Sequence, residues 1–158
     1  MRAPIRADRA VAPAVLPIFA LADQFGRKLD TATFDGVPLI VVVGNREGAP
    51  GVALWTAALR AVIGDEGDTH VLPVAEVHGV PRMLRRMVRR LLPRDPAQWC
   101  AVDWDGQLGA LIRGTAAPLV AAAYDANRAL RTWTPLPVTK VEDTLLVALV
   151  EAAARLSA

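Results

Sequence analysis

The arrangement of apolar and polar positions divides the chain into alternating strands and helices. The run VPLIVVV at 37–43 is unbroken and β-branched, which is typical of a strand buried on both faces. The segments 70–77 and 98–102 predict two further strands, and helical segments separate all three. Because strands connected through helices run parallel in a sheet, we expect these three strands to form a parallel core.

Apolar residues at helical spacing predict two longer helices between these strands. The first covers about 51–63 and ends at Gly64, a residue that commonly terminates helices. The second covers 80–92, where Pro81 suits the first turn. We expect its apolar face to pack on the sheet, and this face consists of Val80, Met83, Leu84, Met87, Val88 and Leu91.

The C-terminal half predicts a short helix at 107–113, closed by Gly114, and a last helix capped by Thr139. Glu142 would complete a capping box with Thr139. The expected apolar face of this last helix consists of Val141, Leu145, Leu149 and Leu156.

Turn-forming residues predict two hairpins. One covers 17–30 with its turn at 24–27, and the other covers 118–133 with its turn at 125–128. The expected fold class is therefore α/β, a mixed sheet with helices on both faces. Residues 1–15 are expected to form a flexible arm, and residues 16–158 a single domain.

Composition and charge narrow the function classes. The chain has 158 residues, 53% of them hydrophobic, and a formal charge of +2. This charge is too small to indicate a nucleic-acid partner. No apolar run reaches the roughly 18 residues that a membrane-spanning helix needs.

The N-terminal segment leaves two compartments open. The single cysteine, Cys100, excludes an internal disulfide and favours a reducing cytoplasmic compartment. Export is the alternative, because arginines precede the apolar run 10–22, which ends in a small-x-small pattern typical of secretory signals. Phe19 and Leu21 within this run are expected to be core residues, which argues against cleavage after Ala22.

The inventory of reactive side chains excludes several mechanisms. The single serine, Ser157, is too close to the C-terminus to serve in a catalytic triad, and the chain has only two histidines. His70 and His78 have no metal-ligand spacing, so we predict structural roles for them and no metal or cofactor. Asp103 and Asp105 are predicted to form a turn, because too few oxygen ligands accompany them to bind a metal.

Five short patterns, in order, resemble the thioredoxin-like superfamily and most closely its redoxin branch, the alkyl hydroperoxide reductase and thiol-specific antioxidant type. They are PIFALADQFG at 17–26, Phe34-Asp35-Gly36 before VPLIVVV, WCAVDWDGQLGALIRG at 99–114, Pro118, and the hairpin that follows it. The resemblance implies a thioredoxin-like sheet with an antiparallel C-terminal hairpin and an N-terminal hairpin. It also implies that the Ala117–Pro118 peptide bond is cis.

The reactive cysteines of this superfamily are missing. Gly48-Ala49-Pro50-Gly51 occupies the place of the Cys-x-x-Cys motif, and the peroxiredoxin Pro-x-x-x-Thr-x-x-Cys pattern is absent as well. Thiol exchange and peroxide reduction both need a thiolate. We therefore expect a redox-inactive binding or scaffolding module rather than an enzyme, in which this loop is a degenerate active site beside Pro118.

Two alternatives stay open. One is a thiol-dependent oxidoreductase or peroxidase that works through Cys100 or a partner's thiol, although no basic residue lies within four positions of Cys100 and a buried structural cysteine is favoured. The other is small-anion binding at the helix N-terminus, residues 48–52, assisted by Arg46.

The helix at 80–92 carries a basic face that could contact an anionic partner. The interpretation we favour is a solvated face opposite a packed apolar side. The expected partner is an unidentified protein or a small anion, and a homodimer is a further option. The face consists of Arg82, Arg85, Arg86, Arg89 and Arg90.

Overall fold

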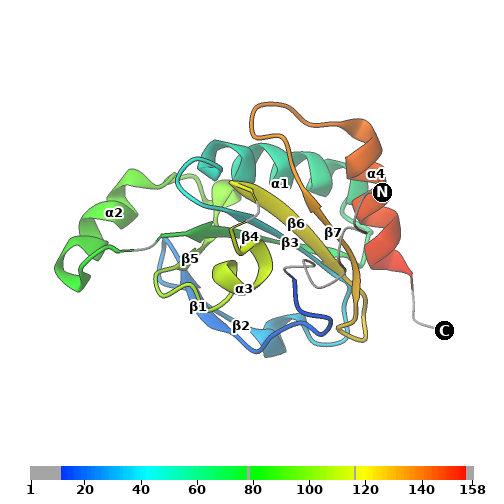
Figure 1. Cartoon of the computed structure of the whole chain (residues 1–158), viewed down its shortest axis with the longest axis horizontal. Helices are drawn as coiled ribbons and strands as arrows, with labels where there is room; N and C mark the ends of the chain where they lie inside the picture. The colour runs from blue at the N-terminus through cyan, green and yellow to red at the C-terminus, as the bar shows by residue number, and fades with distance from the viewer. Residues whose placement is uncertain (1–11, 78, 116, 156–158) are drawn as a thin grey trace, which may run out of the picture.

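The computed structural model describes residues 12–77, 79–115 and 117–155 (Figure 1). Within these ranges seven strands form one sheet in the order β2-β1-β5-β4-β3-β6-β7. The strands are β1 (Ala20–Asp23), β2 (Lys28–Asp30), β3 (Leu39–Gly44), β4 (His70–Glu76), β5 (Ala101–Asp103), β6 (Leu119–Tyr124) and β7 (Leu130–Pro135).

The centre of the sheet is parallel, as predicted. β3 pairs in parallel with β4, and β4 pairs in parallel with β5. The two predicted hairpins are β1–β2 and β6–β7, and β6 lies antiparallel to β3. The sheet is therefore mixed, with the unbroken apolar strand β3 between β4 and β6.

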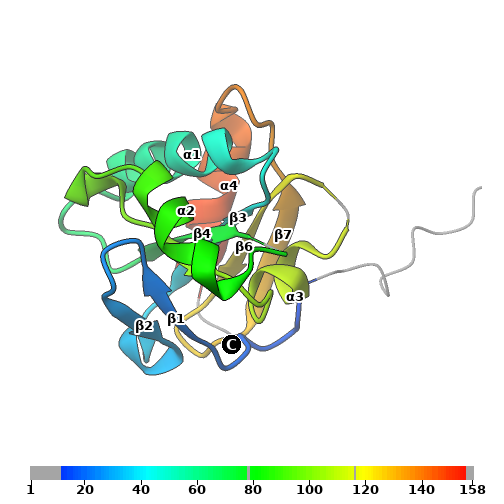
Figure 2. The same cartoon turned by 90° about the vertical axis from the view of Figure 1, so that its left-hand side faces the viewer.

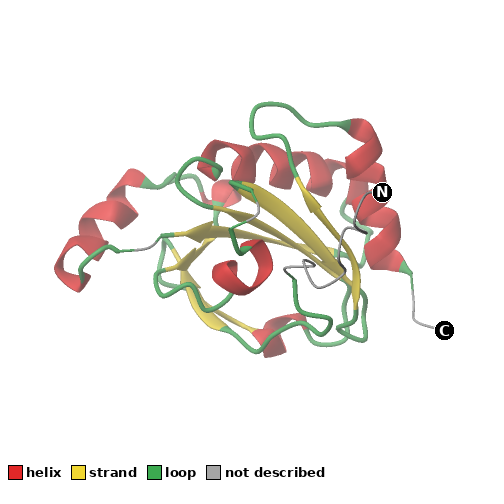
Figure 3. Cartoon of the chain, in the orientation of Figure 1, coloured by secondary structure: helices red, strands yellow, loops and turns green. Residues whose placement is uncertain are grey.

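Helices cover both faces of the sheet (Figure 3). The helices α1 (Ala49–Ile63) and α4 (Asp143–Ala154) pack on the face that carries Ile40 and Val42. The short helix α3 (Gly109–Arg113) packs on the opposite face, which carries Val41 and Val43. This division follows from the period of a strand, whose successive side chains point to opposite faces.

Short 3₁₀ helices connect some of these elements. They are η2 (Thr31–Phe34), η3 (Arg82–Leu84) and η4 (Pro96–Gln98). η3 leads directly into α2 (Arg85–Leu91), so the helix predicted at 80–92 exists but its first turn is 3₁₀.

The predicted packing of the 80–92 apolar face on the sheet is wrong. Met83 is 86% exposed, Met87 61% and Leu91 81%. The helix is held instead by its basic edge, because the guanidinium groups of Arg85 and Arg89 lie over the ring of Trp104. Figure 1 shows α2 projecting away from the sheet at one end of the molecule, and Figure 2 shows the same helix from that end.

The predicted capping box of the last helix is also wrong. The helix begins at Asp143 with Glu142 as its N-cap, and no side chain caps it. The preceding segment is held by other bonds, since Trp55 Nε1 donates to the carbonyl oxygen of Pro137. Leu149 is buried as predicted, and Leu146 and Ala153 complete the buried face. Val141 and Leu145 are partly buried against the same core, and Leu156 lies outside the described residues.

The N-terminal segment belongs to the core where the structure describes it. Phe19 is 2% exposed and Leu21 7%, as predicted. Of the segment predicted as an arm, only residues 12–15 are described. Ala12 among them is buried, and Val15 pairs with Ala129.

Candidate functional site

The loop between β3 and α1 lies against the segment that begins β6. The backbone amide of Asn45 donates to the carbonyl oxygen of Pro118 at 3.0 Å. The side chain of Asn45 turns inward and accepts from the amides of Glu47 and Gly48, at 3.0 Å each. The structure therefore brings the GAPG loop and Pro118 side by side, as the resemblance implies.

The positions that carry cysteine in thioredoxins have no space for a side chain here. A Cβ atom on Gly48 would overlap the carbonyl oxygen of Pro118 and lie 2.7 Å from its carbonyl carbon. A Cβ atom on Gly51 would lie 2.5 Å from Leu119 Cδ2 and 3.0 Å from the carbonyl oxygen of Val138. Both glycines are buried, so the loop fills the place of a thiol site with backbone.

The loop keeps few donors for an anion. The amides of Glu47 and Gly48 are bound by Asn45, and the amide of Gly51 donates to the carbonyl oxygen of Gly48. Pro50 has no amide hydrogen. Arg46 and Glu47 are both exposed, and the negative charge of Glu47 further weakens the attraction of this end of α1 for anions.

The predicted cis bond at Pro118 is wrong. The described residues contain no cis peptide bond, so Ala117–Pro118 is trans. The trans isomer is the favoured one for proline by about 0.5–1 kcal/mol.

A buried ion pair lies beside this loop, at the end of β4. Arg113 donates through Nε and Nη2 to the two carboxylate oxygens of Glu76, at 2.6 and 3.1 Å. The same guanidinium donates to the carbonyl oxygen of Ala117, at 3.1 Å. This pair joins β4, α3 and the segment before Pro118. No sequence pattern indicates this pair, because the two residues are 37 positions apart.

Cys100 lies just before β5 and lines the same cavity as Ala49 of the GAPG loop. It is 8% exposed, and its backbone amide donates to Gln24 Oε1 at 2.8 Å. Burial, with a smaller effect of the negative charge of Asp23, raises the pKa of the Cys100 thiol from 9.0 to about 11. The thiol is therefore protonated at neutral pH and a weak nucleophile.

The five arginines predicted as one face are divided in the structure. Arg85 and Arg89 contact Trp104, and Arg85 pairs with Asp105 at 3.2 Å. The others are exposed beside the apolar face of α2, and they are Arg82, Arg86 and Arg90.

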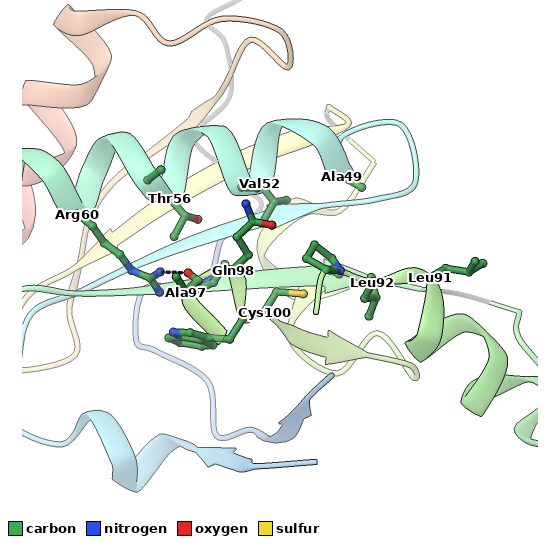
Figure 4. A pocket seen from close by; sticks show the side chains of 15 residues that line it. Ala49, Val52, Thr56, Arg60, Leu91, Leu92, Ala97, Gln98 and Cys100 are labelled. Atoms are coloured by element: carbon green, nitrogen blue, oxygen red, sulfur yellow. Dashed lines mark hydrogen bonds between the residues drawn. The ribbon is translucent and has the colours of Figure 1, made fainter. Parts of the chain in front are cut away.

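Two cavities lie next to the candidate residues described above. One, of about 680 Å³, lies between the 44–49 loop and α2, and Glu76 and Arg113 contribute to its lining. The other, of about 290 Å³, lies along the flank of α1 and reaches Cys100 (Figure 4). Sequence reasoning missed Thr56 and Arg60 in the second cavity, because at helical spacing they are ordinary polar positions.

Two of the remaining candidates, Asp103 and His70, make contacts within the described residues. Asp103 accepts hydrogen bonds from the amides of Gln107, Leu108 and Gly109, which forms the predicted turn before α3. The His70 ring contacts Phe34 edge-on. His78 lies outside the described residues. Among the residues described, no group of three or more His, Cys, Asp or Glu side chains could hold a metal.

The part of the chain that the structure describes also lacks any helix with the length and apolar character needed to cross a membrane.

Neither the protein-family models nor the curated proteins compared with this chain match its sequence. Solved structures do match its fold. Mycobacterium tuberculosis dsbF aligns with a TM-score of 0.63 and 16% identity, over 90% of this chain and 99% of that one. The exposed lipoprotein thioredoxin Etrx1 from Streptococcus pneumoniae aligns at 0.60 and 17%, over 85% and 98%.

A secreted Mycobacterium tuberculosis disulfide oxidoreductase homologous to E. coli DsbE aligns at 0.53 and 18% identity, over 92% of this chain and 99% of that one. These likenesses show the fold alone, which is thioredoxin-like, with the mixed sheet and the two hairpins expected from the sequence.

Proposed function

We propose that this chain is a thioredoxin-fold binding module that performs no thiol–disulfide exchange at its 48–51 loop. The observation that carries the proposal is the position of Gly48, where any Cβ atom would overlap the carbonyl oxygen of Pro118. The neighbours named above include a disulfide oxidoreductase and a thioredoxin. This chain retains their scaffold, while its loop holds neither a thiol nor the space for one.

Cys100 does not replace the missing pair. One cysteine cannot form an internal disulfide, and the raised pKa of this thiol keeps the thiolate scarce at neutral pH. The alternative of an enzyme that uses Cys100 therefore has less support than the binding role.

The partner surface we propose is the cavity of about 680 Å³ together with the open apolar face of α2. Met83, Met87 and Leu91 leave a contiguous apolar strip exposed on one helix, and such strips mark interaction sites. Arg82, Arg86 and Arg90 border the strip. A protein segment that presents apolar side chains flanked by carboxylates matches both features. A concave groove beside the helix suits such a segment better than a flat bilayer.

Redox chemistry is tested by incubating the reduced protein with glutathione disulfide and, separately, with hydrogen peroxide. We expect no turnover above that of Cys100→Ser in either assay. Catalytic turnover by the unsubstituted chain that Cys100→Ser loses would contradict the proposal and favour the Cys100 enzyme.

The partner surface is tested with a photo-crosslinking residue at Met87, and with the same residue at the exposed Val147 of α4 as the matched control. We expect an acidic protein to crosslink only from Met87. Its purified form should then bind the full chain, and Arg82→Glu combined with Arg86→Glu should weaken this binding. Binding only to vesicles that contain phosphatidylglycerol, or crosslinking only to a second copy, would contradict the proposed partner.

We also propose that the chain is not cleaved after Ala22 in either compartment. Such a cleavage would remove Phe19, Leu21 and most of β1, which lies between β2 and β5. One of the neighbours named above is an exposed lipoprotein and another is secreted, which supports the exported alternative, whereas the single cysteine supports the cytoplasm. Mass spectrometry of the protein from its source cells would reveal a terminus at Asp23 if the proposal is wrong.

A further inference from the structure

The cavity along the flank of α1 is a second concave site that adjoins the cavity beside the GAPG loop. The two share Ala49, Ala75, Leu91 and Leu92 in their linings. It has a volume of about 290 Å³ and lies between α1, β4 and the segment 91–100. Its lining is mostly small and apolar, with Val52 on α1, Ala75 on β4 and Leu92 beyond α2. Small-molecule sites are commonly concave and apolar, with a few polar groups that orient the ligand.

Thr56 supplies one such polar group. Its side chain is 4% exposed and lines the cavity, and its hydroxyl Oγ1 has no hydrogen-bond partner. Figure 4 shows the side chain descending from α1 toward the opposite wall, from which Gln98 reaches up. A buried hydroxyl without a partner is costly, and native structures usually pair it. A ligand acceptor in the cavity would complete the pairing.

Arg60 supplies a second polar group, one helical turn beyond Thr56. Its guanidinium lies 5.0 Å from the ring centroid of Trp99 and donates to the carbonyl oxygen of Ala97 at 3.2 Å. Among the described side chains, no carboxylate forms an ion pair with it. Burial lowers the pKa of Arg60, which is the effect expected of a cation whose charge is not compensated. A guanidinium has five N–H donors, so donors remain for an anion.

We propose that this cavity binds a carboxylic acid with an unbranched apolar tail, of the medium-chain fatty acid class. The carboxylate accepts hydrogen bonds from Thr56 Oγ1 and from Arg60, which are neighbours at i and i+4 on α1. The tail lies along Val52 toward Ala49 and Leu92. Seven residues of helix separate Thr56 from Ala49, which gives the tail about 10 Å. This site needs no protein partner, although Ala49 and Leu92 also line the cavity proposed for one.

The experiment is calorimetric titration of the full chain with octanoate, and with octylamine and octanol as matched probes. We expect saturable octanoate binding and at least tenfold weaker binding of both other probes. Thr56→Val, which keeps the shape of the side chain, should weaken octanoate binding about tenfold, and Arg60→Met should weaken it by at least as much. Octanoate should also slow alkylation of Cys100 by N-ethylmaleimide, because the thiol lines the same cavity.

Folding controls keep the result interpretable. Thr56→Val should raise the melting temperature of the unliganded protein while it weakens octanoate binding. A variant that only damaged the fold would lower both the melting temperature and the affinity for octanoate. The proposal is overturned if octanoate does not bind. It is equally overturned if octylamine binds as tightly, or if both variants keep the affinity of the unsubstituted chain.

Discussion

The N-terminal end of α1 and the flank of the same helix differ in how completely they are filled. At the N-terminal end, a Cβ atom on Gly48 would meet the backbone of Pro118, and one on Gly51 would meet the side chain of Leu119 and the backbone of Val138. Along the flank, Thr56 and Cys100 border an open cavity of about 290 Å³. The superfamily resemblance draws attention to the first region, but the unpaired hydroxyl of Thr56 lies in the second. A scaffold can lose the chemistry of one site while an adjacent surface stays open.

The largest effect on stability is expected at Gly48, at the N-terminal end of α1. Gly48→Ala should lower the free energy of unfolding by about 3 kcal/mol or more, because the added Cβ overlaps a backbone oxygen that cannot move alone. Urea denaturation measures the loss. Ala53→Ser, exposed one turn further along α1, is the control and should change stability by less than about 0.5 kcal/mol.

Gly51→Ala should lower the free energy of unfolding by less than Gly48→Ala does, which would support the interpretation that backbone atoms exclude a side chain at position 48. There the nearest obstacle is the flexible end of Leu119, although the carbonyl oxygen of Val138 also lies close. If Gly48→Ala were tolerated as well as Ala53→Ser, the loop would have room for a thiol and the comparison would fail.

The buried thiol on the open flank should make stability depend on pH. The pKa of Cys100 is raised by burial from 9.0 to about 11 in the folded chain. Above pH 9 the unfolded state loses this proton and the folded state keeps it, so stability falls as pH rises. Between pH 9 and pH 11 the thiol should therefore remove about 2 to 3 kcal/mol from the free energy of unfolding.

Cys100→Ala provides the comparison for that decline. Burial also raises the pKa of Tyr124, so some loss of stability at high pH will persist in the variant. The difference between the two pH profiles isolates the thiol. If stability depended on pH identically in the two proteins, solvent would reach the Cys100 sulfur freely, and the proposed burial of this thiol would be wrong.

A smaller effect, of opposite sign, is expected at the unpaired hydroxyl. Thr56→Val should raise the free energy of unfolding by about 1 kcal/mol, because it removes a buried polar group and keeps the shape. Thermal or urea unfolding of the unliganded protein measures the gain. Thr144→Val, on the exposed surface of α4, should change stability by less than about 0.5 kcal/mol. Destabilisation by Thr56→Val would show that the hydroxyl has a partner.

The fold was more accessible from the sequence than the sites were. The run 37–43 has only one environment that suits it, a strand covered on both faces, and the alternation around it determined the parallel core. Helical spacing at 80–92 correctly predicted an amphipathic helix, but spacing states only which residues share a face. It carries no information on what covers that face, and here Trp104 holds the basic edge instead.

The errors at the site have the same origin. The cis bond at Pro118 was predicted from the resemblance alone. The contact of Asn45 with Pro118 is a tertiary contact, which sequence patterns do not reveal. Thr56 and Arg60 escaped notice because a missing partner, like the pairing of Glu76 with Arg113, depends on residues far along the chain. The absence of thiols at positions 48 and 51 could be predicted from the sequence, because it depends only on which residues occupy those positions.

The smallest effect on stability is expected on the apolar face of α2. Met83→Gln combined with Met87→Gln should change the free energy of unfolding by less than about 0.5 kcal/mol, because both side chains are mostly in water. Leu59→Ala, fully buried in α1, should cost about 2–5 kcal/mol in the same urea experiment. The double variant should nevertheless lose the acidic partner, since binding rather than folding would bury these methionines. A loss of stability above about 1 kcal/mol would mean that this face already packs against the chain in solution, and the open groove would then have an internal occupant.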